Sequence, residues 1–165
     1  MKTEITGYWT FFCNPLFWHI DKFLETNEKD DTFDVKDWHE QHIKPGHLGI
    51  IRVGFDNRSK KELAGRQKLE RGIYGIVQTL DEPKMTLDKP THYPDAKVPQ
   101  VPRLQVKIHY LKNLLQQPLL LTAIEENPII NADQYLIQGF RSASMPLKVE
   151  AYNVSLPLTT SCFPF

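Results

Sequence analysis

The chain has 165 residues, the size of one domain around one hydrophobic core, so we expect a single domain over residues 1–165. A hydrophobic fraction of 41% and a charged fraction of 24% are ordinary for a globular protein and exclude a disordered chain. Twenty basic residues balance twenty acidic ones. Bulk positive charge therefore cannot drive nucleic-acid binding, although a local basic face is not excluded.

The sequence predicts no membrane segment and no export signal. The longest uncharged stretch near the N-terminus, residues 5–20, is too short and too mixed to span a bilayer, which takes ~20 apolar residues. It also lacks the features of a signal peptide, so we expect a cytoplasmic protein without a membrane partner. Cys13 and Cys162 could pair, but a reducing cytosol favours two free thiols.

The first half of the chain mixes strand and helix patterns. An aromatic run ends at Asn14-Pro15, a turn signal, and apolar residues then recur at helical spacing. Lys44-Pro45-Gly46 is a second turn signal. The predicted elements are a strand over 7–13, a helix over 15–25, a polar acidic loop over 26–34 and a strand over 47–54.

The second half adds two clear strands and several short helices. Gly75, inside one of the strands, indicates a bulge or a close approach of another group to the backbone. The predicted elements are a strand over 72–80, a long loop over 82–101, a strand over 102–112, helices over 119–126 and 133–138, a small-residue segment over 141–146 and a short element over 147–156. This order predicts a mixed α+β fold with a mainly β core, not alternating βαβ units.

Motifs for common chemistries are absent or weak. His39 and His42 stand three residues apart without a third ligand nearby, so we interpret them as surface histidines and expect no metal. There is no glycine-rich phosphate loop and no G-x-S-x-G motif. Cys13 with His19 could be a nucleophile and its base, but a core cysteine is the better interpretation. We expect no cofactor and no catalytic residues.

Two compositional features carry more information. Nine of the eighteen aromatic residues lie between Tyr8 and Trp38, and one or two of these rings could line a pocket and stack on a planar ligand. The stretch 56–71 holds six basic and three acidic residues. It is either a solvated face or a phosphate clamp, because lysine and arginine contacts to phosphates supply most non-specific affinity for nucleic acids. The candidates for such contacts are Lys60, Lys61, Arg66 and Lys68.

Four segments in order resemble the EVE domain family of the PUA-like superfamily, which is related to YTH domains. They are YWTFFCNPLFWHIDKFL, IKPGHLGIIRVG after Trp38, GIYGIVQTLDEP, and the closing LLLTAIEENPIINADQYLIQGFRSASMPLKVE. The resemblance runs from about Tyr8 to Tyr152. The chain departs from the family at His47, where Asp is usual, at Val53, at Ser144-Met145 and at the insert 56–71, where many members have a short loop.

The resemblance implies a PUA-like pseudo-barrel of about five or six strands with short peripheral helices. It also implies a reader of nucleic acid, DNA or RNA, that holds a modified base in an aromatic-lined pocket. The modification, the choice of DNA or RNA and the oligomeric state stay open. Two alternatives also stay open: a nucleoside amidohydrolase like the ASCH relatives, using lysine and a carboxylate, or a protein-interaction domain that keeps only the fold.

We place the expected pocket between the turn after the first strand, the end of the 47–54 strand and the 141–144 segment. We expect the Asn14 amide to form hydrogen bonds with the edge of a base. Trp18 and Trp38 are the candidate stacking rings, and Gly54 leaves room for a ligand. The basic insert is expected beside the pocket mouth. The full set of expected pocket residues is Asn14, Pro15, Trp18, Trp38, Arg52, Gly54, Arg141 and Ser142.

Overall fold

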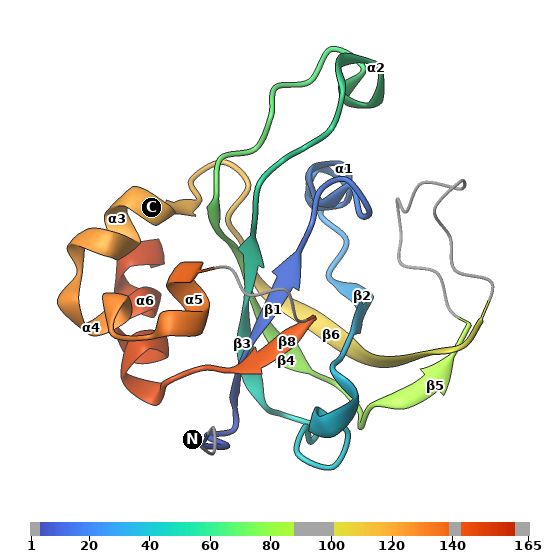
Figure 1. The fold of residues 1–165 in the computed structure, drawn as a ribbon, viewed down its shortest axis with the longest axis vertical. Coiled ribbons are helices and arrows are strands. Elements are labelled where there is room, and N and C mark those ends of the chain that lie inside the picture. The colour runs from blue at the N-terminus through green and yellow to red at the C-terminus, as the bar shows by residue number, and fades with distance from the viewer. Residues whose placement is uncertain (1–3, 88–100, 139–142, 161–165) are drawn as a thin grey trace.

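The computed structural model describes residues 4–87, 101–138 and 143–160. The fold is mixed α+β, with one curled sheet and short helices around it (Figure 1). The strands are β1 (Tyr8–Cys13), β2 (Asp30–Asp34), β3 (Leu48–Val53), β4 (Gly72–Thr79), β5 (Lys84–Thr86), β6 (Arg103–Asn113), β7 (Leu119–Leu120) and β8 (Ser144–Pro146). The helices are α1 (Ile20–Glu25), the 3-10 turn η1 (Asp37–His39), α2 (Lys60–Leu63), α3 (Leu121–Glu126), α4 (Pro128–Asn131), α5 (Gln134–Gln138) and α6 (Val149–Thr160).

The sheet curls until its two edges meet. Its order is β2-β6-β4-β3-β1-β8, with β5 added to β6 and β7 to β4. Strands β1 and β3 run parallel, and the other described pairs are antiparallel. The N–H of Lys36, just after β2, donates to Oγ of Ser144 on β8 at 3.0 Å. This bond links β2 and β8, the two edge strands of the sheet. The predicted pseudo-barrel is therefore confirmed, although the described residues form eight strands where about five or six were expected, and three of them (β5, β7 and β8) are very short.

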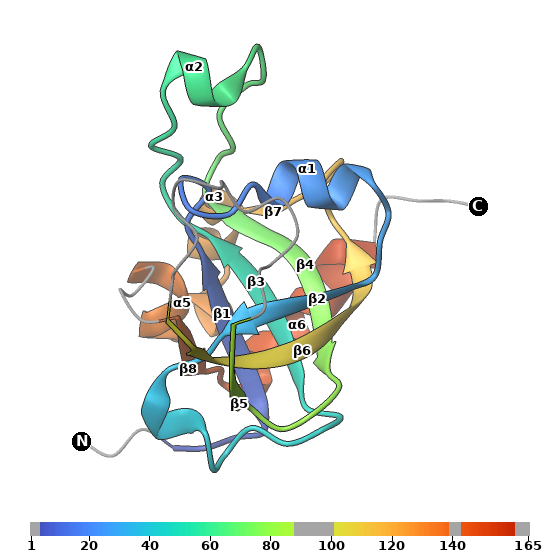
Figure 2. The ribbon, with the colours of Figure 1, turned by 90° about the vertical axis from the view of Figure 1, so that its right-hand side faces the viewer.

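The inside of the barrel is an aromatic-rich core. Alternate residues of each long strand point inward, and α1 covers one end of the barrel (Figure 2). Gly75 is needed there, because a Cβ at this position would lie 2.7 Å from the ring of Tyr110. The inward-facing residues include Trp9, Phe11, Cys13, Phe33, Val35, Ile51, Val53, Val77, Val106, Ile108 and Tyr110.

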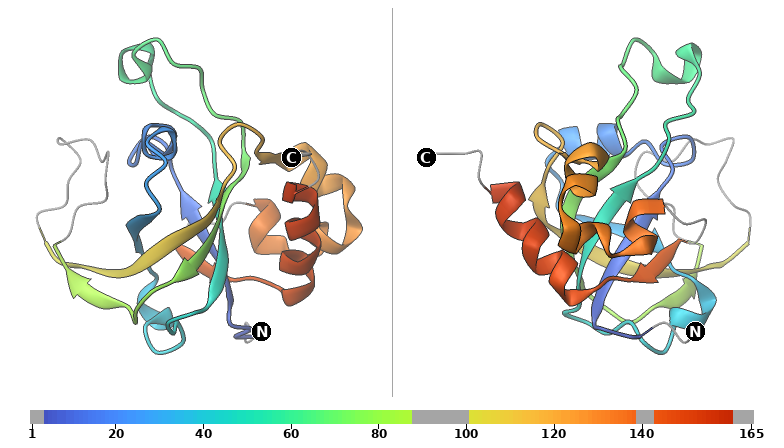
Figure 3. Two further views of the ribbon diagram at one scale, coloured as in Figure 1. Left: turned by 180° about the vertical axis from the view of Figure 1, so that it is seen from behind. Right: turned by 60° about the vertical axis from the view of Figure 1, so that its left-hand side comes forward.

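The outer face of the sheet is covered by the C-terminal helices. Helices α3 to α6 gather on one side of the barrel (Figure 3). Their apolar side chains form a second core with outward-facing residues of β3 and β4, such as Ile50, Ile73 and Ile76. No helix in the described parts of the chain is long and apolar enough to cross a membrane.

Three predicted elements were wrong in part. The long loop over 82–101 contains β5, which pairs with β6. Residues 26–34 are not all loop, because Asp30–Asp34 pairs with β6, with Phe33 opposite Val106 and Asp30 opposite His109. Acidic residues disfavour strands in general, but here β6 supplies the ladder and Phe33 enters the core. The helix predicted over 15–25 begins only at Ile20, because residues 14–18 form a turn.

Candidate functional site

A cavity of about 280 Å³ opens where the turn after β1 faces β2; we call it the turn pocket. It combines three segments that are far apart in the sequence, and one of them directly precedes β8. Among the described residues, its lining includes Phe12, Cys13, Asn14, Phe17, Trp18, Thr32, Phe33, Asp34 and Ala143. The turn and the segment before β8 are two of the three places where the sequence predicts the pocket.

Hydrogen bonds fix the turn that forms one wall. The backbone oxygen of Asn14 accepts from the N–H groups of Phe17 and Trp18 at 3.0 and 3.1 Å. Its side-chain oxygen accepts from the N–H of Leu16 at 3.0 Å, a local turn typical of asparagine. This use of the oxygen leaves the NH₂ group of Asn14 as its main free donor. Pro15 is buried inside the turn and does not line the pocket.

The two aromatic residues of the turn differ in exposure. Trp18 is only 6% exposed, and its ring meets Phe33 edge-on with 5.2 Å between centroids. Phe17 is 45% exposed and borders the same cavity. Trp18 is therefore part of the core as well as the pocket floor, and Phe17 is the accessible ring. The sequence analysis missed Phe17, although it lies off the apolar helical stripe just as Trp18 does.

Strand β2 contributes the polar groups of the pocket. The Asp34 carboxylate is held in place by Arg103 and by the side-chain amide of Gln105 at 3.0 Å. Oγ1 of Thr32 is buried and has no hydrogen-bond partner among the described residues. A buried polar atom without a partner is uncommon, and the residue that carries it borders the cavity. Sequence reasoning missed both residues because it placed them in a loop.

Arg52 lies away from this lining. Its side chain is 1% exposed and donates from Nε to the Leu136 oxygen at 2.8 Å and from Nη2 to the Ile137 oxygen at 3.1 Å. Burial, followed by the charge of Arg71, lowers the pKa of Arg52 to about 10. Arg52 therefore anchors the end of α5 to the sheet. We expected Arg52 in the pocket, but its guanidinium N–H groups are already bonded to these backbone carbonyls.

The remaining expected pocket residues are scattered. Gly54 follows β3 beside the turn, and among the described residues a Cβ there would meet only the Cys13 oxygen, at 3.9 Å. Trp38 is 48% exposed on η1 and is not part of the pocket lining. Arg141 and Ser142 lie outside the described residues. Their predicted role stays a prediction, and Ala143 is the described residue nearest to them in the sequence.

The insert between β3 and β4 is anchored to the barrel by a buried charged cluster. The Arg58 guanidinium, fully buried, bonds to both oxygens of Asp21 on α1 at 3.1 Å and to Asp56 at 2.7 Å. Burial by itself would lower the pKa of Arg58, but these hydrogen bonds and charges raise it. The N–H of Leu69 also donates to Asp56 at 2.9 Å, so both arms of the insert join the cluster.

The other basic residues of the insert divide into two groups. Arg66 forms two bonds with Glu25 on α1, at 2.5 and 2.8 Å, and is thus already paired. Lys60 and Lys61 are exposed on α2, which protrudes from the barrel (Figure 2), and Lys68 is exposed at its base. Arg58 does not belong to a solvated basic face, which corrects our interpretation of the whole stretch as exposed.

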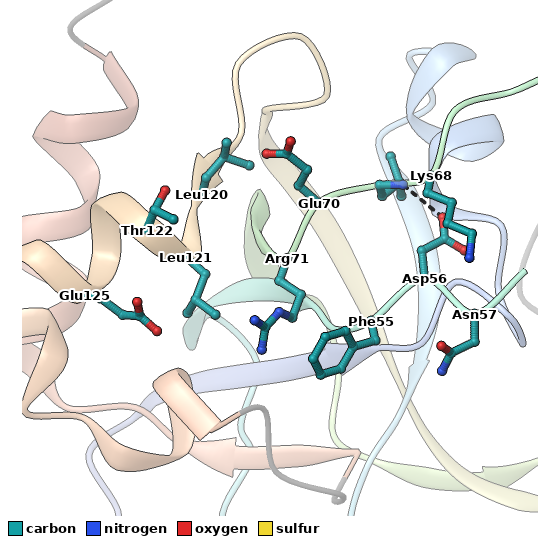
Figure 4. A pocket seen from close by; sticks show the side chains of 11 residues that line it. Phe55, Asp56, Asn57, Lys68, Glu70, Arg71, Leu120, Leu121, Thr122 and Glu125 are labelled. Carbon is teal, nitrogen blue, oxygen red and sulfur yellow. Dashed lines mark hydrogen bonds between the residues drawn. The ribbon is translucent and has the colours of Figure 1, made fainter.

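A second cavity, of about 610 Å³, lies at the base of the insert; we call it the insert pocket (Figure 4). The guanidinium carbon of Arg71 lies 4.0 Å from the ring centroid of Phe55, which is 64% exposed. Asn57 and Lys68 come from the insert, and Thr122 and Glu125 come from α3 across the cavity. The sequence analysis did not expect this pocket.

The comparison with known proteins rests on structure. No protein-family model matches the chain, and no curated protein matches its sequence. A hypothetical protein from Leishmania major has a similar structure, with a TM-score of 0.62 and 17% identity over 93% of this chain and 94% of that one.

Two human structures are also similar. The DUF55 domain of thymocyte nuclear protein 1 gives a TM-score of 0.57 and 15% identity over 93% of this chain and 98% of that domain. Human THYN1 in complex with 5-methylcytosine-containing DNA gives 0.56 and 14% over 93% and 97%. The chain thus shares the fold of these proteins, in agreement with the EVE-type PUA-like fold that the resemblance implies.

Proposed function

We propose that this protein is a nucleic-acid-binding module that holds a modified base in the turn pocket. The observation that carries the proposal is the combination of Phe17, Thr32 and Asp34 around one small cavity. An exposed ring can stack on a base, and a fixed carboxylate and an unpartnered hydroxyl can bond its edge. At about 280 Å³ the cavity lies near the lower limit of small-molecule sites, ~300–1,000 Å³, which suits a single base.

The free energy gained by stacking a base in the pocket is similar to the cost of taking the base out of its own stack. Taking a base out of a stack costs a few kcal/mol, and stacking on an aromatic side chain returns ~1–3 kcal/mol. A methyl-sized group that fills a remaining gap adds ~1–3 kcal/mol of discrimination over the plain base. A pocket with a preformed floor, here Trp18 against Phe33, loses little of this energy to reorganisation.

Lys60, Lys61 and Lys68 are the proposed phosphate contacts. They are exposed on the insert, whereas Arg66 is paired with Glu25 and serves mainly to hold the insert against α1. The complex of human THYN1 with 5-methylcytosine-containing DNA, a protein of the same fold, supports a nucleic-acid partner for this chain. DNA and RNA are both retained as partners.

Binding to matched oligonucleotides tests the proposal. Fluorescence anisotropy would compare labelled DNA and RNA strands that differ only by 5-methylcytosine, 5-hydroxymethylcytosine or N6-methyladenine against the plain base. We expect one modified strand to bind roughly 10- to 200-fold more tightly than its plain counterpart. Phe17→Ala should remove this preference, and Trp38→Ala, which changes an equally exposed ring outside the pocket, should retain it. Equal affinity for every pair would refute the proposal.

A further inference from the structure

The turn pocket and the insert pocket lie at the same end of the barrel, where the parallel strands β1 and β3 end. The N–H of Gly54 donates to the Cys13 oxygen at 3.1 Å, so β1 and β3 end side by side. The chain after β1 then borders the turn pocket, and the chain after β3, residues 55–57, borders the insert pocket. A ligand strand that enters one pocket can therefore reach the other without crossing the barrel.

The insert pocket has a ready surface for stacking. Arg71 lies on the Phe55 ring, yet the phenylalanine retains 64% of its exposure. No ion pair holds Arg71 among the described residues. An aromatic ring with an arginine beside it is a surface on which bases stack without regard to sequence.

The polar groups of this pocket fit the edge of a base better than a bare phosphate. Glu125 faces the cavity from α3, and Glu70 also lines it (Figure 4). Lys68 and Arg71 also line the cavity, so its charges nearly balance and do not select a phosphate, whereas a carboxylate accepts hydrogen bonds from the amino and imino groups of a base. The amide of Asn57, on the opposite side of Phe55 from Arg71, can donate and accept.

The pocket is also held in shape before any ligand enters. Asp56, one of its lining residues, is bonded to the buried Arg58 and to the N–H of Leu69. The outgoing and returning arms of the insert are thus joined to each other and, through Asp21, to α1. A site that is ordered in advance binds without the cost of ordering a loop.

We propose that the insert pocket binds a second, unmodified base of the same strand, next to the modified base, and that Glu125 favours guanine there. This inference rests on the proposed function of the turn pocket. Guanine offers an imino and an amino group side by side, and one carboxylate can accept from both. The larger volume, about 610 Å³, accommodates a purine with its sugar.

Strands that differ beside the modified base test this inference. In anisotropy titrations, replacing a flanking guanine by inosine, which lacks the amino group, should weaken binding to the wild-type protein about tenfold. Glu125→Gln should reduce that difference to about twofold. Glu126→Gln, a matched exposed change on the same helix outside the pocket lining, should leave it unchanged. Phe55→Ala should weaken binding for every flanking base while the ratio of modified to plain base is retained.

The outcomes separate the two proposals. If no strand binds to the wild-type protein, both are refuted. If the wild-type protein prefers the modified base, and both Phe55→Ala and Glu125→Gln retain wild-type affinity and the same guanine-to-inosine ratio, the second site alone is refuted. Both side chains are exposed, so thermal melting of each variant should match the wild type and exclude misfolding as the cause of lost binding.

Discussion

Phe17 and Trp18 are neighbours in the sequence with different surroundings. Trp18 packs against Phe33 and Phe23 in the barrel core, and Phe17 is exposed at the mouth of the turn pocket. The sequence analysis named Trp18 and Trp38 as the candidate stacking rings. The burial of Trp18 argues that its removal costs much stability, and transfers the stacking role to Phe17.

We predict that Trp18→Ala lowers the free energy of unfolding by about 3–5 kcal/mol, because it empties a buried tryptophan site. Phe17→Ala should lower it by less than about 1 kcal/mol, since the ring is exposed. Urea denaturation of both variants measures the two values. Similar losses for both would contradict the division between core and pocket mouth.

His39 is a buried titratable group inside the fold. It is 0% exposed, and its Nδ1 lies 2.7 Å from Oγ of Ser144. Its Nε2 has no hydrogen-bond partner in the part of the chain that the structure describes. Burial, then the charges of His42 and Lys36, lowers its pKa from 6.5 to about 4. The earlier interpretation of His39 as a surface histidine is therefore corrected.

The lowered pKa of His39 predicts a loss of stability in acid. Between pH 6.5 and 4 the unfolded chain binds a proton on His39 that the folded protein does not, so stability is complete above pH 6.5 and falls as the pH drops. We expect a contribution of about 2 kcal/mol to be lost between pH 7 and pH 5. Chemical denaturation at both pH values should show that the free energy of unfolding changes less between pH 7 and pH 5 in His39→Gln than in the wild type. An unchanged difference would mean that His39 is not responsible.

At the scale of elements, the insert is fixed by charges that are buried. We predict that Arg58→Met costs about 3–5 kcal/mol, because it leaves Asp21 and Asp56 buried without their partner. Lys61→Met, an exposed change on the same insert, should cost less than about 0.5 kcal/mol. Chemical denaturation distinguishes them, and a small effect of Arg58→Met would contradict the anchoring role of the cluster.

The elements that the sequence predicts well are those with a strong apolar period. Strands β1, β3, β4 and β6 follow from runs such as LGIIRV, whose hydrophobic residues need a core. Strand β2 could not be predicted from DDTFD, because its pairing with β6 is a tertiary contact. The burial of Arg58 was equally hidden, since its partner Asp21 is thirty-seven residues away.

At the scale of the whole molecule, the sequence resemblance predicts the pseudo-barrel. The sequence analysis names two of the segments that border the turn pocket, but not the β2 residues that line it. Thr32 and Asp34 come to the pocket only because the sheet curls β2 round to face β1. The same curl brings the end of β2 to β8, where the N–H of Lys36 donates to Oγ of Ser144. Long-range closure of this kind leaves no local pattern in the sequence.

The zero net charge of the chain makes the exposed lysines of the insert the expected source of salt dependence. Replacing Lys60, Lys61 and Lys68 by Gln should weaken binding to all sequences and reduce the slope of log affinity against log salt by up to about 2–3 units, about 0.7–0.9 per phosphate contact. Titrations at several salt concentrations measure the slope. Arg66→Gln should change it less, because Arg66 is paired with Glu25. An unchanged slope in the triple variant would mean that the insert is a solvated face.

The claim that a modified base occupies the turn pocket is tested most directly by nuclear magnetic resonance. Two titrations of the ¹⁵N-labelled protein, with strands identical except for the modification, would be subtracted so that only the effect of the modified group remains. We predict that the remaining shifts are concentrated in the backbone amides of residues 16–18 and 32–34, which surround the cavity. Shifts confined to the insert or to the C-terminal helices, with none around the turn pocket, would contradict the account.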